Sequence, residues 1–318
     1  MWNAILAIQL LVSPATPHLG PLGMEVQPGE TLRVAVTGSG RPVVIIPGLF
    51  GAIEGFSRLS DSLVASGYRV LIVEPLGVGS SGRPAHADYS LTAQAGRIAA
   101  VMEELDMQPA VVVAHSVGAA IALRLALLRP ELVAAVVSLE GGPAETIATA
   151  GLRRALKMAP LLKLFGSGPL RGKIARNLRA ASGDTTWLTD SVVRVYTSGP
   201  ARDLGATLRA LKGMVNAVEP WPLGPALERI TCPVVLVQGL APHDGSPDEA
   251  ARAKMETIPH FTLEALPGVG HYVFEETPDL VVGIIKRAAP AAGLEQDPQL
   301  PFMRHQTMSL DYRERARP

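Results

Sequence analysis

The chain has 318 residues, 47% of them hydrophobic, and its 29 Lys and Arg residues balance 29 Asp and Glu residues to give a formal net charge of zero. This composition supplies a large core and excludes global disorder, and the balanced charge argues against a dedicated nucleic-acid-binding protein, which usually carries a basic excess. The single cysteine, Cys232, excludes an internal disulfide and a thiolate metal cluster.

The first 23 residues are expected to form an N-terminal extension. Residues 4–12 are mostly apolar, and a weak small-residue cleavage site follows at residues 13–15. A secretory signal would also carry basic residues before the apolar stretch, and residues 1–3 include none. The stretch is also far shorter than the ~20 residues that span a bilayer. These features favour a cytoplasmic protein, with secretion or a periplasmic location as the alternative.

Apolar runs of strand length alternate with helical patterns along residues 24–140 and 229–292, which predicts one core built from both segments. The predicted strands are Thr31–Val36, Val43–Ile46, Val70–Val73, Val111–Val113, Val133–Leu139, Val234–Val237 and Phe261–Leu266. The predicted helices are Phe56–Ala65, Thr92–Leu105, Ala119–Leu128, Asp248–Ile258 and Pro278–Ala288. Buried strands separated by helices predict an α/β fold with a mostly parallel sheet covered on both faces. Ligands bind such sheets at the carboxyl ends of the strands.

Residues 141–228 interrupt this alternation with a mostly helical pattern, which predicts a helical cap over the strand ends. Within it, residues 151–180 contain eight basic residues and no Asp or Glu. A solvated basic face of an amphipathic helix is the favoured interpretation, and a surface attracted to anionic lipids or acidic substrates is the alternative. Beyond the last predicted helix, residues 293–318 mix charges, prolines and isolated apolar residues without any period, which predicts a mobile tail.

The strongest catalytic signal is a hydrophobic strand that ends in Ala114-His115-Ser116-Val117-Gly118 and continues directly into a helix. A sharp strand-to-helix turn requires small residues two positions before and two after its central serine, which Ala114 and Gly118 provide. The turn lifts the Ser116 hydroxyl out of the sheet and leaves the Val117 amide free to face a developing oxyanion. Ser116 is therefore the candidate nucleophile, and a serine in an ordinary loop is the alternative.

Two further motifs make residues 24–292 resemble the α/β-hydrolase family. The segment Ile46–Gly51 ends a strand where the family usually carries His-Gly-x, and Glu74–Ser81 is similar to the family's Asp-x-x-Gly-x-Gly-x-Ser turn. The resemblance implies the α/β-hydrolase fold and makes Leu49 the donor of a second oxyanion amide beside Val117. This sequence has Pro47 in place of the usual histidine. In the family that histidine orders the loop and takes no part in the chemistry.

The general base is expected at His271, in a Gly-bounded segment between the last predicted strand and the last predicted helix. Ser116 needs a neutral imidazole to accept its proton, and histidine is the side chain that titrates near neutral pH. The resemblance also places the family's catalytic histidine on this loop. Among the other histidines, His243 is expected in a polar loop, and His115 is expected to point away from the nucleophile.

The acid that orients His271 has two candidates. Members of the family most often carry an Asp three residues after the Gly that ends the strand corresponding to residues 234–238, and here that position is Pro242. Glu140 ends an earlier strand, at a site that some relatives use, including a branch of the haloalkane dehalogenases. Asp244 lies in the loop after Gly239 and is the alternative. Because Pro242 occupies the usual Asp position, Glu140 is favoured as the acid.

These residues predict hydrolysis of a small carboxylic ester with an apolar acyl or alcohol group through an acyl-enzyme. A serine nucleophile argues against dehalogenase and epoxide hydrolase chemistry, which uses Asp in those relatives. The alternatives on the same triad are lactonase, thioesterase, aminopeptidase, carbon–carbon bond hydrolase and cofactor-free haloperoxidase, and a second class is a ligand-binding protein on this scaffold. No metal, P-loop or dinucleotide motif is found in its required context, so we expect no metal and no cofactor.

Overall fold

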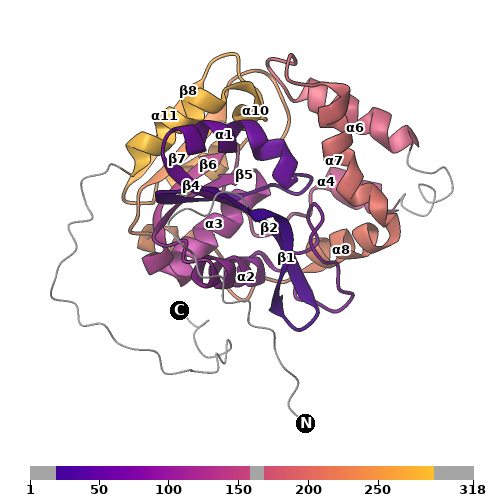
Figure 1. Cartoon of the computed structure of the whole chain (residues 1–318), viewed down its shortest axis with the longest axis horizontal. Coiled ribbons are helices and arrows are strands. Elements are labelled where there is room, and N and C mark those ends of the chain that lie inside the picture. The colour runs from indigo at the N-terminus through magenta and orange to yellow at the C-terminus, as the bar shows by residue number, and fades with distance from the viewer. Residues whose placement is uncertain (1–18, 158–167, 290–318) are drawn as a thin grey trace, which may run out of the picture.

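The computed structural model describes residues 19–157 and 168–289, and their strands form one sheet in the order β1-β2-β4-β3-β5-β6-β7-β8 (Figure 1). The strands are β1 (Leu19–Gln27), β2 (Glu30–Gly38), β3 (Arg41–Ile46), β4 (Tyr68–Glu74), β5 (Ala110–His115), β6 (Val133–Leu139), β7 (Val234–Gly239) and β8 (Phe261–Leu266). β2 pairs antiparallel with both β1 and β4, and every other neighbouring pair is parallel. The mostly parallel sheet that the sequence predicts is therefore confirmed.

Helices cover both faces of the sheet, as the apolar pattern of the strands requires. The core helices are α1 (Ser57–Ala65), α2 (Leu91–Glu104), α3 (Val117–Leu128), α9 (Glu249–Met255), α10 (Val273–Glu276) and α11 (Pro278–Ala288), with short 3-10 helices η1 (Ile53–Phe56), η2 (Pro130–Leu132) and η3 (Gly224–Arg229). One hydrophobic cluster joins Val112 of β5 to Ile98 of α2, and another joins the next residue, Val113, to Leu63 of α1. Because successive side chains of a strand point to opposite faces, both faces of β5 are buried.

Between β6 and β7 lies residue segment 141–228, which we call the cap. Its described helices are α4 (Ala150–Lys157), α6 (Gly168–Ala180), α7 (Asp190–Arg202) and α8 (Leu204–Asn216), and they gather on one side of the sheet (Figure 1). Arg153, Arg154 and Lys157 on α4 are exposed, whereas part of the predicted basic segment falls within residues 158–167, outside the described ranges. No helix in the described ranges has the length and apolarity to cross a membrane.

The first strand differs from the sequence prediction. Residues 19–23 belong to β1, although the sequence places them in the N-terminal extension. β1 has no buried run, because its residues alternate between exposed and half-buried, and it is held by pairing with β2. Residues 1–18 and the predicted tail at residues 293–318 lie outside the described residues.

Candidate active site

Ser116 occupies a strained turn between β5 and α3. Its backbone has φ 53° and ψ −124°, a conformation that a residue with a side chain rarely adopts. Its side chain makes no capping hydrogen bond to α3, and its amide donates to the Leu139 carbonyl at 2.9 Å. The turn thus holds the main chain of a half-buried serine while leaving the hydroxyl uncommitted, which is the arrangement of a nucleophile elbow.

Glycines allow three segments to pack around this turn. A Cβ atom on Gly118 would lie 2.7 Å from the Ile46 carbonyl oxygen, and one on Gly141 would overlap the Ser116 carbonyl oxygen. A Cβ on Gly48 would lie 3.1 Å from the Cβ of Ser116. The loop after β3 and the residue after Glu140 therefore contact Ser116 directly, and a side chain at Gly141 would overlap it.

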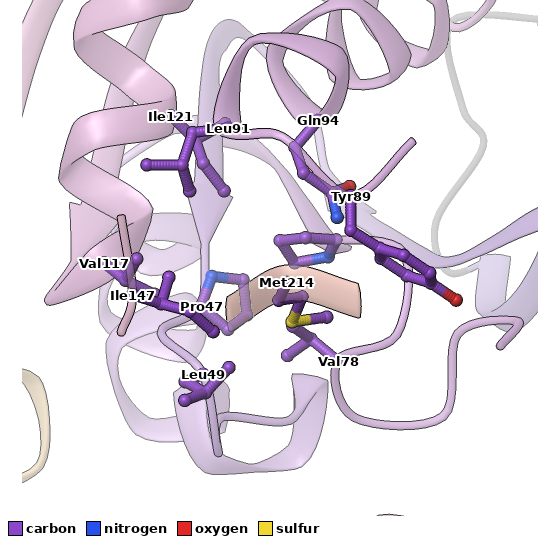
Figure 2. Close-up of a pocket in the computed structure, with 11 residues that line it drawn as sticks. Pro47, Leu49, Val78, Tyr89, Leu91, Gln94, Val117, Ile121, Ile147 and Met214 are labelled. Carbon is purple, nitrogen blue, oxygen red and sulfur yellow. The ribbon is translucent and has the colours of Figure 1, made fainter. Parts of the chain in front are cut away.

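The two predicted oxyanion donors lie beside this turn. Val117 is the first residue of α3, so its amide has no acceptor inside the helix. Leu49 follows Gly48, whose backbone packs against Ser116. Both residues line one pocket, shown in Figure 2, where the predicted donors and Pro47 lie on the same side. This geometry agrees with an oxyanion site built from the two amides, which stays a prediction.

The His271 loop is held by main-chain bonds to two other segments. The His271 amide donates to the Ala181 carbonyl of the cap at 2.7 Å, and a Cβ on Gly270 would lie 2.6 Å from the Gly183 amide nitrogen. On the other side, Nε2 of His115 lies 3.0 Å from the His271 carbonyl oxygen. The loop is thus fixed between the cap and the residue that precedes the nucleophile.

His115 has a structural role that its sequence position did not reveal. Burial, followed by the nearby His271 ring, holds the pKa of His115 well below its ordinary value. The neutral ring therefore donates from Nε2 to the His271 carbonyl. A Cβ on Gly48 would lie 3.1 Å from its Nδ1, so the ring also packs against the predicted oxyanion loop.

Glu140 lies at the end of β6, fully buried and with a positive φ of 56°. Its Oε1 accepts from the Gly239 amide, and its Oε2 accepts from the Ser246 hydroxyl and from His243 Nε2 at 3.0 Å. The Nδ1 atom of His271 lies 3.7 Å from the same Oε2, and this buried nitrogen has no hydrogen-bond partner. Burial raises the pKa of Glu140, but the donors that face it outweigh burial and hold the pKa below its ordinary value.

Asp244 has different surroundings. Its side chain is exposed, and among the described residues no hydrogen bond or ion pair joins it to His271. The neighbouring residue approaches instead, since a Cβ on Gly245 would lie 3.3 Å from His271 Cε1. The distances favour Glu140 as the acid, and the assignment stays a prediction.

Two residues of this loop complete a site that the sequence did not predict. His243, expected in a polar loop, has a side chain only 1% exposed, and Ser246 lies between it and the Glu140 carboxylate. The absence of the usual Asp at Pro242 was the signal that could have revealed them. If Glu140 is the acid, its buried carboxylate needs hydrogen-bond donors, and the loop that contains Pro242 can supply them.

The same cluster has the composition of a metal site. One ligand atom from each of Glu140, His243 and His271 lies within 4.8 Å of the others. Two imidazoles and a carboxylate are a donor set that zinc uses. The sequence predicts no metal here, since the three residues are far apart in the chain. The Nδ1 atom of His271 is also the atom that a triad acid must bind, so metal coordination and triad function would exclude each other.

An apolar pocket lies beside Val117, the residue after Ser116 (Figure 2). It encloses about 310 Å³ when its opening to solvent is counted, and it is lined by Pro47, Leu49, Pro75, Val78, Tyr89, Leu91, Gln94, Val117, Ile121, Ile147 and Met214. Ile147 and Met214 belong to the cap, so the cap forms part of the wall. The space inside it that the centre of a water molecule can reach is only about 20 Å³, so the pocket is narrow in this structure.

The two polar side chains in this wall already have partners. The Tyr89 hydroxyl donates to the Pro84 carbonyl at 2.8 Å. The Gln94 amide accepts from the Leu76 amide at 3.0 Å and donates to the Leu76 carbonyl at 2.9 Å. The side chains of the pocket therefore present an apolar lining to a ligand.

The α/β-hydrolase family model matches residues 43–284 of this chain. The magnesium-chelatase 30 kDa subunit of Rhodobacter capsulatus is 28% identical over 256 residues, which cover 77% of this chain and 86% of that protein.

Solved structures share the fold at lower identity. Cfl2 from Burkholderia cenocepacia has a TM-score of 0.70 at 20% identity, covering 85% of this chain and 95% of its own. Epoxide hydrolase CorEH has a TM-score of 0.71 at 17% identity, covering 85% of this chain and 98% of its own. The family match spans most of this sheet and both sides of the Ser116 turn, and the chain therefore belongs to the α/β-hydrolase family.

Proposed function

We propose that this chain is a serine hydrolase that cleaves small carboxylic esters of apolar acyl or alcohol groups through an acyl-enzyme. The observation that carries the proposal is the strained Ser116 turn beside a buried His271 loop and an apolar pocket. A positive φ at a non-glycine residue costs of order 1–3 kcal/mol, and such strain persists mainly where a site requires it.

We assign one residue or group of residues to each step of the reaction. Ser116 attacks the carbonyl carbon while His271 accepts the hydroxyl proton and then delivers it to the leaving alcohol. The amides of Leu49 and Val117 stabilise the oxyanion. Glu140 orients His271 and stabilises its imidazolium. Water then attacks the acyl-enzyme by the same route, with His271 again accepting a proton.

The pocket supports the apolar class of substrate. Its lining is aliphatic apart from Tyr89 and Gln94, whose polar atoms are already bonded. A charged acyl chain would lose its hydration there without gaining a partner. Lactones and thioesters share the same carbonyl chemistry and stay as alternatives within the class. A serine nucleophile argues against transfer of the epoxide hydrolase mechanism from the structural relative.

A fluorophosphonate probe and a panel of short-chain acyl esters, lactones and thioesters test the proposal. We expect the probe to label Ser116 and the panel to show a burst followed by steady turnover. Ser116→Ala should abolish labelling and lower turnover at least ~1,000-fold. Ser57→Ala, at an exposed serine of α1, is the matched control and should behave as wild type. Labelling of another serine, or ligand binding without turnover, would overturn the proposal.

A further inference from the structure

The Glu140 carboxylate, which lies near His271, is in hydrogen-bond contact with another histidine, His243. Nε2 of His243 lies 3.0 Å from Glu140 Oε2, and Nδ1 of the same ring lies 2.7 Å from the Ala241 carbonyl oxygen. The His243 side chain is 1% exposed and that of Glu140 is fully buried. Both contacts therefore lie away from solvent, where a mismatched donor and acceptor would be costly.

Two side chains donate to one oxygen of this carboxylate. An ionised carboxylate oxygen only accepts, so Nε2 of His243 is the donor in the 3.0 Å contact with Oε2. Ser246 Oγ, 2.8 Å from Nε2, donates its own proton to the same Oε2. His243, Ser246 and Glu140 therefore form one hydrogen-bonded cluster.

These bonds fix the carboxylate in one orientation. The Gly239 amide holds Oε1, while Ser246 and His243 hold Oε2 on the side that faces His271. Glutamate has one more rotatable bond than the usual aspartate, so an acid at this position needs more support to stay in one rotamer. The loop that lacks the usual acid supplies that support.

We propose that His243 is a positioning residue, which donates from Nε2 to Glu140 and keeps this carboxylate aimed at His271. The inference rests on the proposed function, in which Glu140 is the acid of the triad. The usual acid of the family lies on the loop after β7. In this chain that loop would instead supply His243, which holds the Glu140 carboxylate at the end of β6.

The test compares His243→Ala with His243→Gln in the full chain. Glutamine places a neutral donor close to the position of Nε2, whereas alanine removes the donor. We expect His243→Ala to lower kcat ~10–100-fold with KM changed less than ~2-fold, as for loss of an outer-shell partner. His243→Gln should recover most of kcat, because its amide can donate to Glu140 Oε2. His86→Gln, at an exposed histidine, is the control.

Two results would overturn the inference while leaving the proposed function intact. One is His243→Ala with wild-type kcat when Glu140→Gln is inactive. The other is a His243→Gln variant that keeps the wild-type melting temperature and yet loses kcat by ~10-fold or more, which decides the matter even where the alanine variant fails to fold. Near-normal turnover by Glu140→Gln would instead overturn Glu140 as the acid, and the inference with it.

Discussion

The Nδ1 atom of His271 lies 3.7 Å from the Oε2 atom of Glu140, with no hydrogen-bond partner of its own. A hydrogen bond between nitrogen and oxygen spans about 2.7–3.2 Å, so a movement of under ~1 Å would form one. The His271 loop could make this movement when its ring becomes charged, because an imidazolium is drawn toward a carboxylate. Catalytic hydrogen bonds are often long in unliganded structures and shorten when substrate binds.

The first prediction is that Glu140→Gln reduces turnover by ~10,000-fold, since loss of the triad acid removes both the tautomer control and the charge that stabilises the imidazolium. Asp244→Asn should keep near-normal turnover, because the Asp244 side chain is exposed and is not joined to His271. Steady-state kinetics on one ester, with the melting temperature as a fold check, measures both. A normal Glu140→Gln enzyme beside an inactive Asp244→Asn enzyme would reverse the assignment.

The local sequence pattern was sufficient to predict the core of the fold. Strand β6 and helix α11 have the bounds that the sequence predicts, Val133–Leu139 and Pro278–Ala288, because an apolar run and a proline at the helix start mark them clearly. β1 was not predicted, because it carries Gly20, Pro21 and Gly23 and is held by pairing with β2 rather than by burial.

The candidate site, like the fold, was predictable from the sequence only in part. Ser116 was predictable because the small residues, the strand and the helix of its turn are contiguous in sequence. The cluster of His243, Ser246 and Glu140 was not, because it depends on how the loop after β7 folds back across the end of β6. No local pattern encodes that contact. His243 stands in a polar loop, two residues before a glycine, and such a position predicts a solvent-exposed side chain.

The second prediction concerns the contact behind the nucleophile. A Cβ on Gly141 would overlap the Ser116 carbonyl oxygen and lie 2.5 Å from Ala119 Cβ, both within rigid main-chain elements. Gly141→Ala should therefore destabilise the fold by at least ~1–3 kcal/mol, as overpacking does, and slow the labelling of Ser116. Gly142→Ala is the matched control, because its nearest neighbour, Ala251 Cβ, would lie at an ordinary 3.4 Å. Equal melting temperatures of the two variants would contradict this packing.

The third prediction concerns Glu275 of α10, which joins the core to the cap. Its Oε1 accepts a hydrogen bond from the Tyr196 hydroxyl of α7 at 3.2 Å, and its side chain is buried. Burial raises the pKa of Glu275 from 4.5 to about 7, and the Tyr196 bond and the charge of Arg58 offset this only in part.

The sign of the effect on stability follows from linkage. The folded chain holds the Glu275 proton more tightly than the unfolded chain does, so this contribution is fully present below pH 4.5 and is lost as the pH rises to about 7. At ~1.4 kcal/mol per pKa unit, the loss amounts to at most ~3.5 kcal/mol. Glu275→Gln stays neutral and should be more stable than wild type at pH 8, with a smaller fall in melting temperature between pH 5 and pH 8.

Two variants separate this effect from the general pH response of the chain. Glu256→Gln, at an exposed glutamate of the core, should retain the wild-type fall in melting temperature. Tyr196→Phe removes the donor to the charged carboxylate, so its melting temperature should fall further than that of wild type at pH 8 and little at pH 5. Parallel melting curves for wild type and Glu275→Gln across this range would show that the carboxyl ionises in the folded chain as it does in the unfolded chain. The contact between α7 and α10 would then not respond to pH.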